Sequence, residues 1–141
     1  MQKPIVLVVD DEEGIAKLLR IVVEMWGGEV YVASNGLEAI AYIQGMKPNL
    51  IILDIMMPGI NGIELCEMMR QHENTKESYI LVMSALGDID TVGDVLNAGA
   101  SDFWSKPIAR NWMNKLRALL KQVVEGKNAE DAKADSTSEA K

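Results

Sequence analysis

Acidic side chains and a few other polar groups stand at the ends of apolar runs in this sequence. Four consecutive acids follow the first run: Asp10, Asp11, Glu12 and Glu13. Later runs end at Asp54 and at Ser84, and Lys106 follows the last β-prone segment. Carboxylates, a hydroxyl and an ammonium have, in combination, the chemistry to bind a cation and a phosphoryl group.

The apolar runs belong to a regular alternation of two kinds of segment. Apolar or β-prone segments, expected to be strands, cover residues 5–9, 29–33, 50–53, 79–83 and 102–104. Segments with helical periodicity lie between them at residues 15–26, 37–44, 63–69 and 90–98, and a last one begins near Arg110. Such alternation favours a parallel sheet with helices on both faces. We therefore predict an α/β fold, a (βα)₅ doubly wound domain over residues 1–125.

The end of the chain differs in composition from the rest. Residues 126–141 contain no Leu, Ile, Val or aromatic residue. Such a segment lacks the apolar surface that would offset the entropy cost of ordering it. We predict a disordered polar tail.

The predicted sheet brings the acidic residues together. Sites of open α/β sheets lie outside the carboxyl ends of the strands, and neighbouring strands lie about 4.8 Å apart, so Asp10, Asp11 and Asp54 should share one pocket. Two unit charges about 5 Å apart repel by roughly 3 kcal/mol at an effective dielectric of about 20, so these acids need a proton or a metal. Mg²⁺ suits oxygen ligands and keeps water positions open to a phosphate. A transition metal is disfavoured, because His72 is the only imidazole and Cys66 the only thiol.

Asp54 is the expected nucleophile of this pocket. A carboxylate that attacks phosphorus forms an aspartyl phosphate, and an adjacent cation reduces the repulsion between nucleophile and phosphodonor. The Lys106 ammonium and the Ser84 hydroxyl are expected to bind phosphoryl oxygens.

These residues resemble the motifs of the response-regulator receiver family of two-component signalling, in the CheY-like superfamily. The similarity runs from about Ile5 to Val124. The matching motifs, in the family's order and at spacings close to its own, are Val8-Val9-Asp10-Asp11-Glu12, Leu53-Asp54-Ile55-Met56-Met57-Pro58 with Gly62, Met83-Ser84-Ala85, and Gly99-Ala100-Ser101-Asp102 leading through Phe103 to Lys106-Pro107. Each motif is short, but the combination is specific.

The resemblance implies a five-stranded parallel sheet with the flavodoxin-like strand order 2-1-3-4-5. It also implies that Asp54 is the phosphoacceptor. Asp10 and Asp11 would hold Mg²⁺ with Asp54, and the backbone carbonyl of Met56 would be a further metal ligand.

The resemblance also implies how the site acts as a switch. Ser84 and Lys106 would bind the phosphoryl group, with Ser84 moving toward it, and Phe103 would turn inward. Phe103 lacks the hydroxyl of the commoner tyrosine. Residues 85–98, with Gly87, Gly93 and few large apolar side chains, are a plausible low-stability element that shifts. The output face would combine this helix with the last strand and the last helix.

Composition and resemblance together predict the setting of this switch. Expected partners are a sensor histidine kinase or phosphotransfer protein and a downstream protein target, with the chain a monomer or a phosphorylation-dependent dimer. A net charge of −7 disfavours direct nucleic-acid binding. No stretch is long enough for membrane insertion, no signal peptide is recognisable and there is one cysteine, which suggests a cytoplasmic location. No output domain follows Val124, so we expect a stand-alone receiver.

Competing functions of this fold fit the residues less well. A Mg²⁺-dependent hydrolase would need an acid or base two residues after the nucleophile, where Met56 stands. A flavodoxin-like cofactor binder would need a phosphate loop rich in hydroxyls and glycine, and neither nucleotide-binding glycine motif occurs. A degenerate receiver would lack part of the acid, hydroxyl and lysine set. We therefore expect a signalling switch that is not a turnover enzyme.

Apolar residues around the expected phosphoryl site and a cluster of methionines lead to two further expectations. Met56 and Leu86 would flank the phosphoryl group with apolar side chains that cannot orient a water molecule, so the phosphorylated state should be long-lived. The cluster of Met56, Met57, Met68 and Met69 is expected to fill gaps in the core.

Overall fold

The strands of the domain form one parallel sheet. The computed structural model describes residues 3–85, 87–106 and 111–125, and nothing below concerns the others. Its strands are β1 (Ile5–Val9), β2 (Glu29–Ala33), β3 (Leu50–Leu53), β4 (Tyr79–Ser84) and β5 (Asp102–Ser105). They pair in the order β2-β1-β3-β4-β5, all parallel. The predicted fold and strand order are confirmed, and β4 and β5 each extend one residue beyond prediction.

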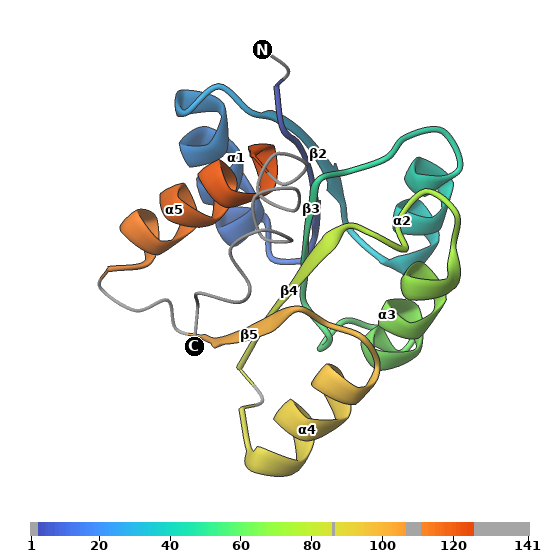
Figure 1. Ribbon diagram of the computed structural model, residues 1–141. Helices are drawn as coiled ribbons and strands as arrows, with labels where there is room; N and C mark the ends of the chain where they lie inside the picture. Colours follow the sequence, from blue (N-terminus) through green and yellow to red (C-terminus); the bar gives the residue numbers. More distant parts are fainter. Residues whose placement is uncertain (1–2, 86, 107–110, 126–141) are drawn as a thin grey trace, which may run out of the picture.

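Helices cover both faces of this sheet. They are α1 (Glu13–Met25), α2 (Gly36–Ile43), α3 (Gly62–Gln71), α4 (Ile89–Asn97) and α5 (Trp112–Val124). Figure 1 shows α1 and α5 on one face and α2, α3 and α4 on the other. The predicted start of the last helix near Arg110 and the predicted polar tail lie outside the described residues. Within the described ranges, no helix has both the length and the apolar character needed to cross a bilayer.

Alternating side chains of the central strands build two hydrophobic cores. In β1, Val6 and Val8 belong to the core shared with α1 and α5, whereas Leu7 and Val9 belong to the core shared with α2, α3 and α4. All four side chains are 0% exposed. Because successive side chains of a strand point to opposite faces, a strand covered on both faces must be apolar throughout. This explains the unbroken apolar runs of the sequence.

A close approach of two backbones shapes the loop after β3. A Cβ atom on Gly62 would lie 2.4 Å from the Cα of Ile55, so only glycine fits there. The preceding residue, Asn61, caps α3 by accepting a hydrogen bond from the Ile63 N–H (2.7 Å). The Asn61-Gly62 pair is therefore the start of a helix that packs against the residues after β3.

The end of α4 is fastened to α3 by an arginine. The guanidinium of Arg70 donates to the carbonyl oxygen of Gly99 from Nε (2.9 Å) and from Nη2 (2.7 Å), and Nη1 donates to that of Ser78 (2.8 Å). The other end of α4 is more open, since Ile89 is 86% exposed and Val95 is the helix's buried residue. Helix α4 is thus anchored mainly at its C-terminal end.

Candidate functional site

Parallel pairing brings two carboxylates to the same level at the carboxyl edge of the sheet. Val9 of β1 pairs with Leu53 of β3, so Asp10 and Asp54 follow side by side. The Asp54 N–H donates to the carbonyl of Val9 (2.9 Å), which continues the ladder by one bond. Asp10 and Asp54 are 5% and 4% exposed. Two carboxylates are therefore buried next to each other.

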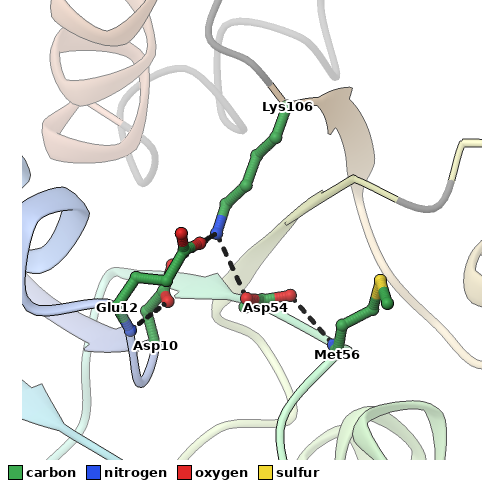
Figure 2. Close-up of polar contacts among 5 residues, drawn as sticks. All are labelled: Asp10, Glu12, Asp54, Met56 and Lys106. Atoms are coloured by element: carbon green, nitrogen blue, oxygen red, sulfur yellow. Dashed lines mark hydrogen bonds and ion pairs between the residues drawn. The ribbon is translucent and has the colours of Figure 1, made fainter.

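A lysine from the far edge of the sheet reaches both acids. Lys106 follows β5, and its backbone N–H donates to the backbone carbonyl of Ser84 at the end of β4 (2.9 Å). Its Nζ donates to Asp10 Oδ2 (2.9 Å), to Asp54 Oδ2 (3.1 Å) and to Glu12 Oε1 (2.5 Å). Figure 2 shows the lysine extended toward the three carboxylates. Each of the three ammonium protons thus has a different carboxylate as its acceptor.

Backbone groups hold the second oxygen of each buried acid. The Met56 N–H donates to Asp54 Oδ1 (2.9 Å), and the Glu12 N–H donates to Asp10 Oδ1 (2.9 Å). The donor in both cases lies two residues after the acid. Asp10 and Asp54 therefore present Oδ2 to the lysine while Oδ1 is fixed by the loop.

The pKa values of Asp10 and Lys106 are both raised, for different reasons. Burial raises the pKa of Asp10, and hydrogen bonds from the Glu12 N–H and from Lys106 only partly offset this. Burial lowers the pKa of Lys106, but its hydrogen bonds to Glu12, Asp10 and Asp54 outweigh burial and hold the pKa above its ordinary 10.5. The lysine therefore stays charged at neutral pH.

The structure places the other predicted site residues around this centre. Ser84 ends β4, the strand next to β3, and is 0% exposed. Asp11, predicted as a metal ligand, is exposed and is not part of the carboxylate group. Phe103 of β5 is half-buried against the core shared with α2, α3 and α4. Leu86 and Pro107 lie outside the described residues.

Sequence reasoning missed the contact made by Glu12 and misjudged two methionines. Glu12 was named as one of four consecutive acids and as the end of a family motif, and nothing in that run indicated which acid would turn toward Lys106. Met69 is buried, but Met56 and Met68 are 52% and 36% exposed, so the prediction that all four methionines fill the core is wrong. Met56 instead exposes an apolar side chain beside the Asp54 carboxylate.

The acidic group has the donor chemistry of a hard-cation site. Oxygen atoms of Asp10, Glu12 and Asp54 lie within 4.8 Å of one another. Carboxylate oxygens are the ligands that Mg²⁺ prefers, so these residues fit the ion. The Lys106 ammonium contacts all three acids, so a dication bound among them would share these carboxylates with the lysine.

Comparison with known proteins identifies the family. The family model of the response regulator receiver domain matches residues 6–121. The chain is 37% identical over 122 residues to the phosphate regulon transcriptional regulatory protein PhoB of Pseudomonas aeruginosa, covering 86% of this chain and 53% of that protein. It is 33% identical over 121 residues to the DNA-binding dual master transcriptional regulator RpaA of Synechocystis, covering 85% of this chain and 50% of that protein.

A solved structure agrees with these relatives. The response regulator receiver domain protein (CheY-like) of Methanospirillum hungatei superposes with a TM-score of 0.78 at 25% identity, covering 89% of this chain and 99% of that one. The chain therefore belongs to the response regulator receiver domain family, a family of signalling switches, and its sheet is the CheY-like form of the flavodoxin-like fold. It spans about half the length of the curated relatives named above.

Replacing Asp10 by Asn is expected to stabilise the protein when Mg²⁺ is absent, because burying an ionised carboxylate costs more free energy than burying a neutral amide. The Asn oxygen can still accept the Glu12 N–H. Since the folded-state pKa of Asp10 is raised above 3.8, this cost is complete above the folded-state pKa and vanishes as the pH falls below 3.8. Denaturant unfolding should show a gain for Asp10→Asn at about pH 7 and none at about pH 3.

The same variant should lose the response to metal. Mg²⁺ at 100 times its Kd is expected to stabilise the wild-type protein by about 2.7 kcal/mol. Asp10→Asn should gain far less, and Glu13→Gln, an exposed acid outside the group, should keep the full gain. A wild-type protein whose unfolding midpoint does not respond to Mg²⁺ would contradict the assigned metal site.

Proposed function

We propose that this chain is a phosphoacceptor switch in which Asp54 takes a phosphoryl group from a histidine kinase or a phosphotransfer protein. The observation that carries the proposal is the arrangement of Asp54 itself. Its carboxylate is buried, fixed at Oδ1 by the Met56 N–H and turned at Oδ2 toward Lys106. A positioned carboxylate next to a permanent cation is the arrangement that phosphoryl transfer to a side chain needs.

The transfer is an in-line displacement at phosphorus. A carboxylate oxygen of Asp54 forms the new O–P bond while the bond between phosphorus and the donor breaks, and the electron pair leaves with the donor. Lys106 binds an equatorial phosphoryl oxygen, and Ser84 donates its hydroxyl to another. Asp10 and Asp54 and, by family resemblance, Asp11 and the Met56 carbonyl would hold Mg²⁺, which would offset charge between nucleophile and donor.

Phosphorylation changes the charge of the site and so the position of the elements around it. The phosphoryl group adds about −1.5 to −2 charge and three strong acceptors. Helix α4 has one buried residue, Val95, and is anchored at Gly99 and open around Ile89. We infer that α4, together with Phe103 on β5, is the part that responds. A downstream protein then binds the face formed by α4, β5 and α5.

Two finer statements belong to the same proposal. The chain is a switch without turnover, because Met56, two residues after the nucleophile, offers no acid or base to activate water. A cytoplasmic location is supported by membership of the receiver family, whose phosphodonors are intracellular.

Asp54→Asn is expected to abolish phosphorylation, because the amide is no nucleophile. Wild-type protein incubated with acetyl phosphate and Mg²⁺ should gain the mass of one phosphoryl group, measured on the intact protein. Asp94→Asn, an exposed aspartate of α4, is the matched control and should be modified like the wild type. Phosphorylation of Asp54→Asn to the wild-type extent would contradict the assignment of the acceptor.

Met56→Asn is expected to shorten the lifetime of the phosphorylated state by about tenfold, because an amide beside the acyl phosphate can orient the attacking water. Intact mass followed over time after removal of the donor gives the half-life. Met68→Asn changes a different exposed methionine, which lies on α3, and should keep the wild-type half-life. Equal half-lives in all three proteins would show that Met56 does not control hydrolysis.

Beryllofluoride, which mimics a phosphoryl group on a carboxylate, is expected to change the exchange of backbone amides in α4. Hydrogen–deuterium exchange should change most around Ile89, far from the anchor at Gly99, and should stay constant in α2. The Asp54→Asn variant should show no change with beryllofluoride. Identical exchange in α4 with and without the mimic would show that this helix is not the responding element.

A further inference from the structure

Glu12 is the solvent-facing partner of an otherwise buried ammonium. The side chain of Lys106 is 9% exposed, and those of Asp10 and Asp54 are 4% and 5% exposed. The side chain of Glu12 is 58% exposed. In the part of the chain that the structure describes, its carboxylate has a hydrogen bond to Lys106 and to no other group. Glu12 is thus the least constrained of the three acids.

The resting contacts leave Lys106 without a spare proton for a phosphoryl group. Its three N–H donors are used by Asp10, Asp54 and Glu12. A phosphoryl oxygen can be bound by the lysine only when one of these contacts breaks. Asp10 and Asp54 are buried and fixed by backbone donors, so the exposed carboxylate of Glu12 is the partner that a phosphoryl oxygen can displace from the lysine.

We propose that Glu12 is a positioning residue that holds Lys106 in the resting site and competes with the incoming phosphoryl group for its ammonium. This inference rests on the proposed function. Because Glu12 is exposed, water replaces the ammonium at its carboxylate when the contact breaks, and the competition is therefore weak. The contact with Glu12 lowers the apparent affinity of the site for a phosphodonor, because only the fraction of protein in which Lys106 is released from Glu12 can bind the donor fully.

The competing explanation is that Glu12 ligates the cation. Its carboxylate lies within 4.8 Å of those of Asp10 and Asp54, close enough to share an ion. The two roles predict opposite kinetic effects. Removing a competitor frees Lys106 and strengthens donor binding, whereas removing a metal ligand weakens the site and slows transfer.

Glu12→Gln is expected to lower the half-saturating concentration of acetyl phosphate about two- to fivefold, the range of an exposed ion pair. The measurement is the rate of phosphorylation by intact mass at saturating Mg²⁺, with the maximal rate unchanged. Glu13→Gln removes the same charge one residue away, without a contact to Lys106, and should keep the wild-type half-saturating concentration. A thermal unfolding midpoint for each variant shows that it is folded under the assay conditions.

The effect must also pass through the lysine. In a Lys106→Met background, Glu12→Gln should no longer alter the half-saturating concentration. Any of four results would overturn the inference while the proposed function stands. Glu12→Gln could lower the half-saturating concentration as much in the Lys106→Met background as in the wild type, or Glu13→Gln could lower it equally. Glu12→Gln could also leave the half-saturating concentration unchanged, or lower the maximal rate. A wild-type protein that takes no phosphoryl group overturns the proposed function, and the inference with it.

Discussion

One ammonium group decides how the carboxyl edge of this sheet holds its charges. Asp10, Glu12 and Asp54 present oxygens within 4.8 Å of one another, and two of these acids are buried. At an effective dielectric of about 20, each pair of ionised acids about 5 Å apart repels by roughly 3 kcal/mol. Lys106 donates to all three and offsets this repulsion. The lysine thus meets part of the same electrostatic demand that a dication at this site would meet.

That arrangement depends on the fold at every step. Parallel pairing sets the ends of β1 and β3 level, so two acids emerge together. The loop after β3 then returns closely over its own strand, because Gly62 packs against Ile55 where no other residue fits. The same tight loop turns the Met56 N–H back to Asp54. A buried carboxylate is tolerated because each oxygen has a donor, and the donors come from the fold itself.

Most of the fold could be predicted from the sequence, and the site only in part. Strands covered on both faces must be apolar throughout, so the sequence predicted their bounds to within one residue. The meeting of Asp10, Asp54 and Lys106 followed from where strands end in a parallel sheet. Which of several adjacent acids turns inward depends on the path of a loop, and loops have no periodicity to indicate it. Glu12 therefore escaped prediction as a contact of Lys106. The prediction that Met56 is a core residue was wrong for a similar reason. An apolar side chain in a loop belongs to no strand or helix face that must be buried.

The contacts around β5 give a change at Lys106 a short physical route to α4. Lys106 directly follows the end of β5, and Gly87, just before α4, lies against that strand. A Cβ atom on Gly87 would stand 3.0 Å from Ser105 Oγ and 3.6 Å from the ring of Phe103. A shift of the lysine toward a phosphoryl group therefore acts on a strand end that already touches the start of α4. Because Arg70 fixes the other end of this helix at Gly99, the N-terminal turns of α4 are the part that the contacts leave less constrained. Under the proposed function we therefore expect the response to be a tilt of α4, which would change the exposed face offered to a partner.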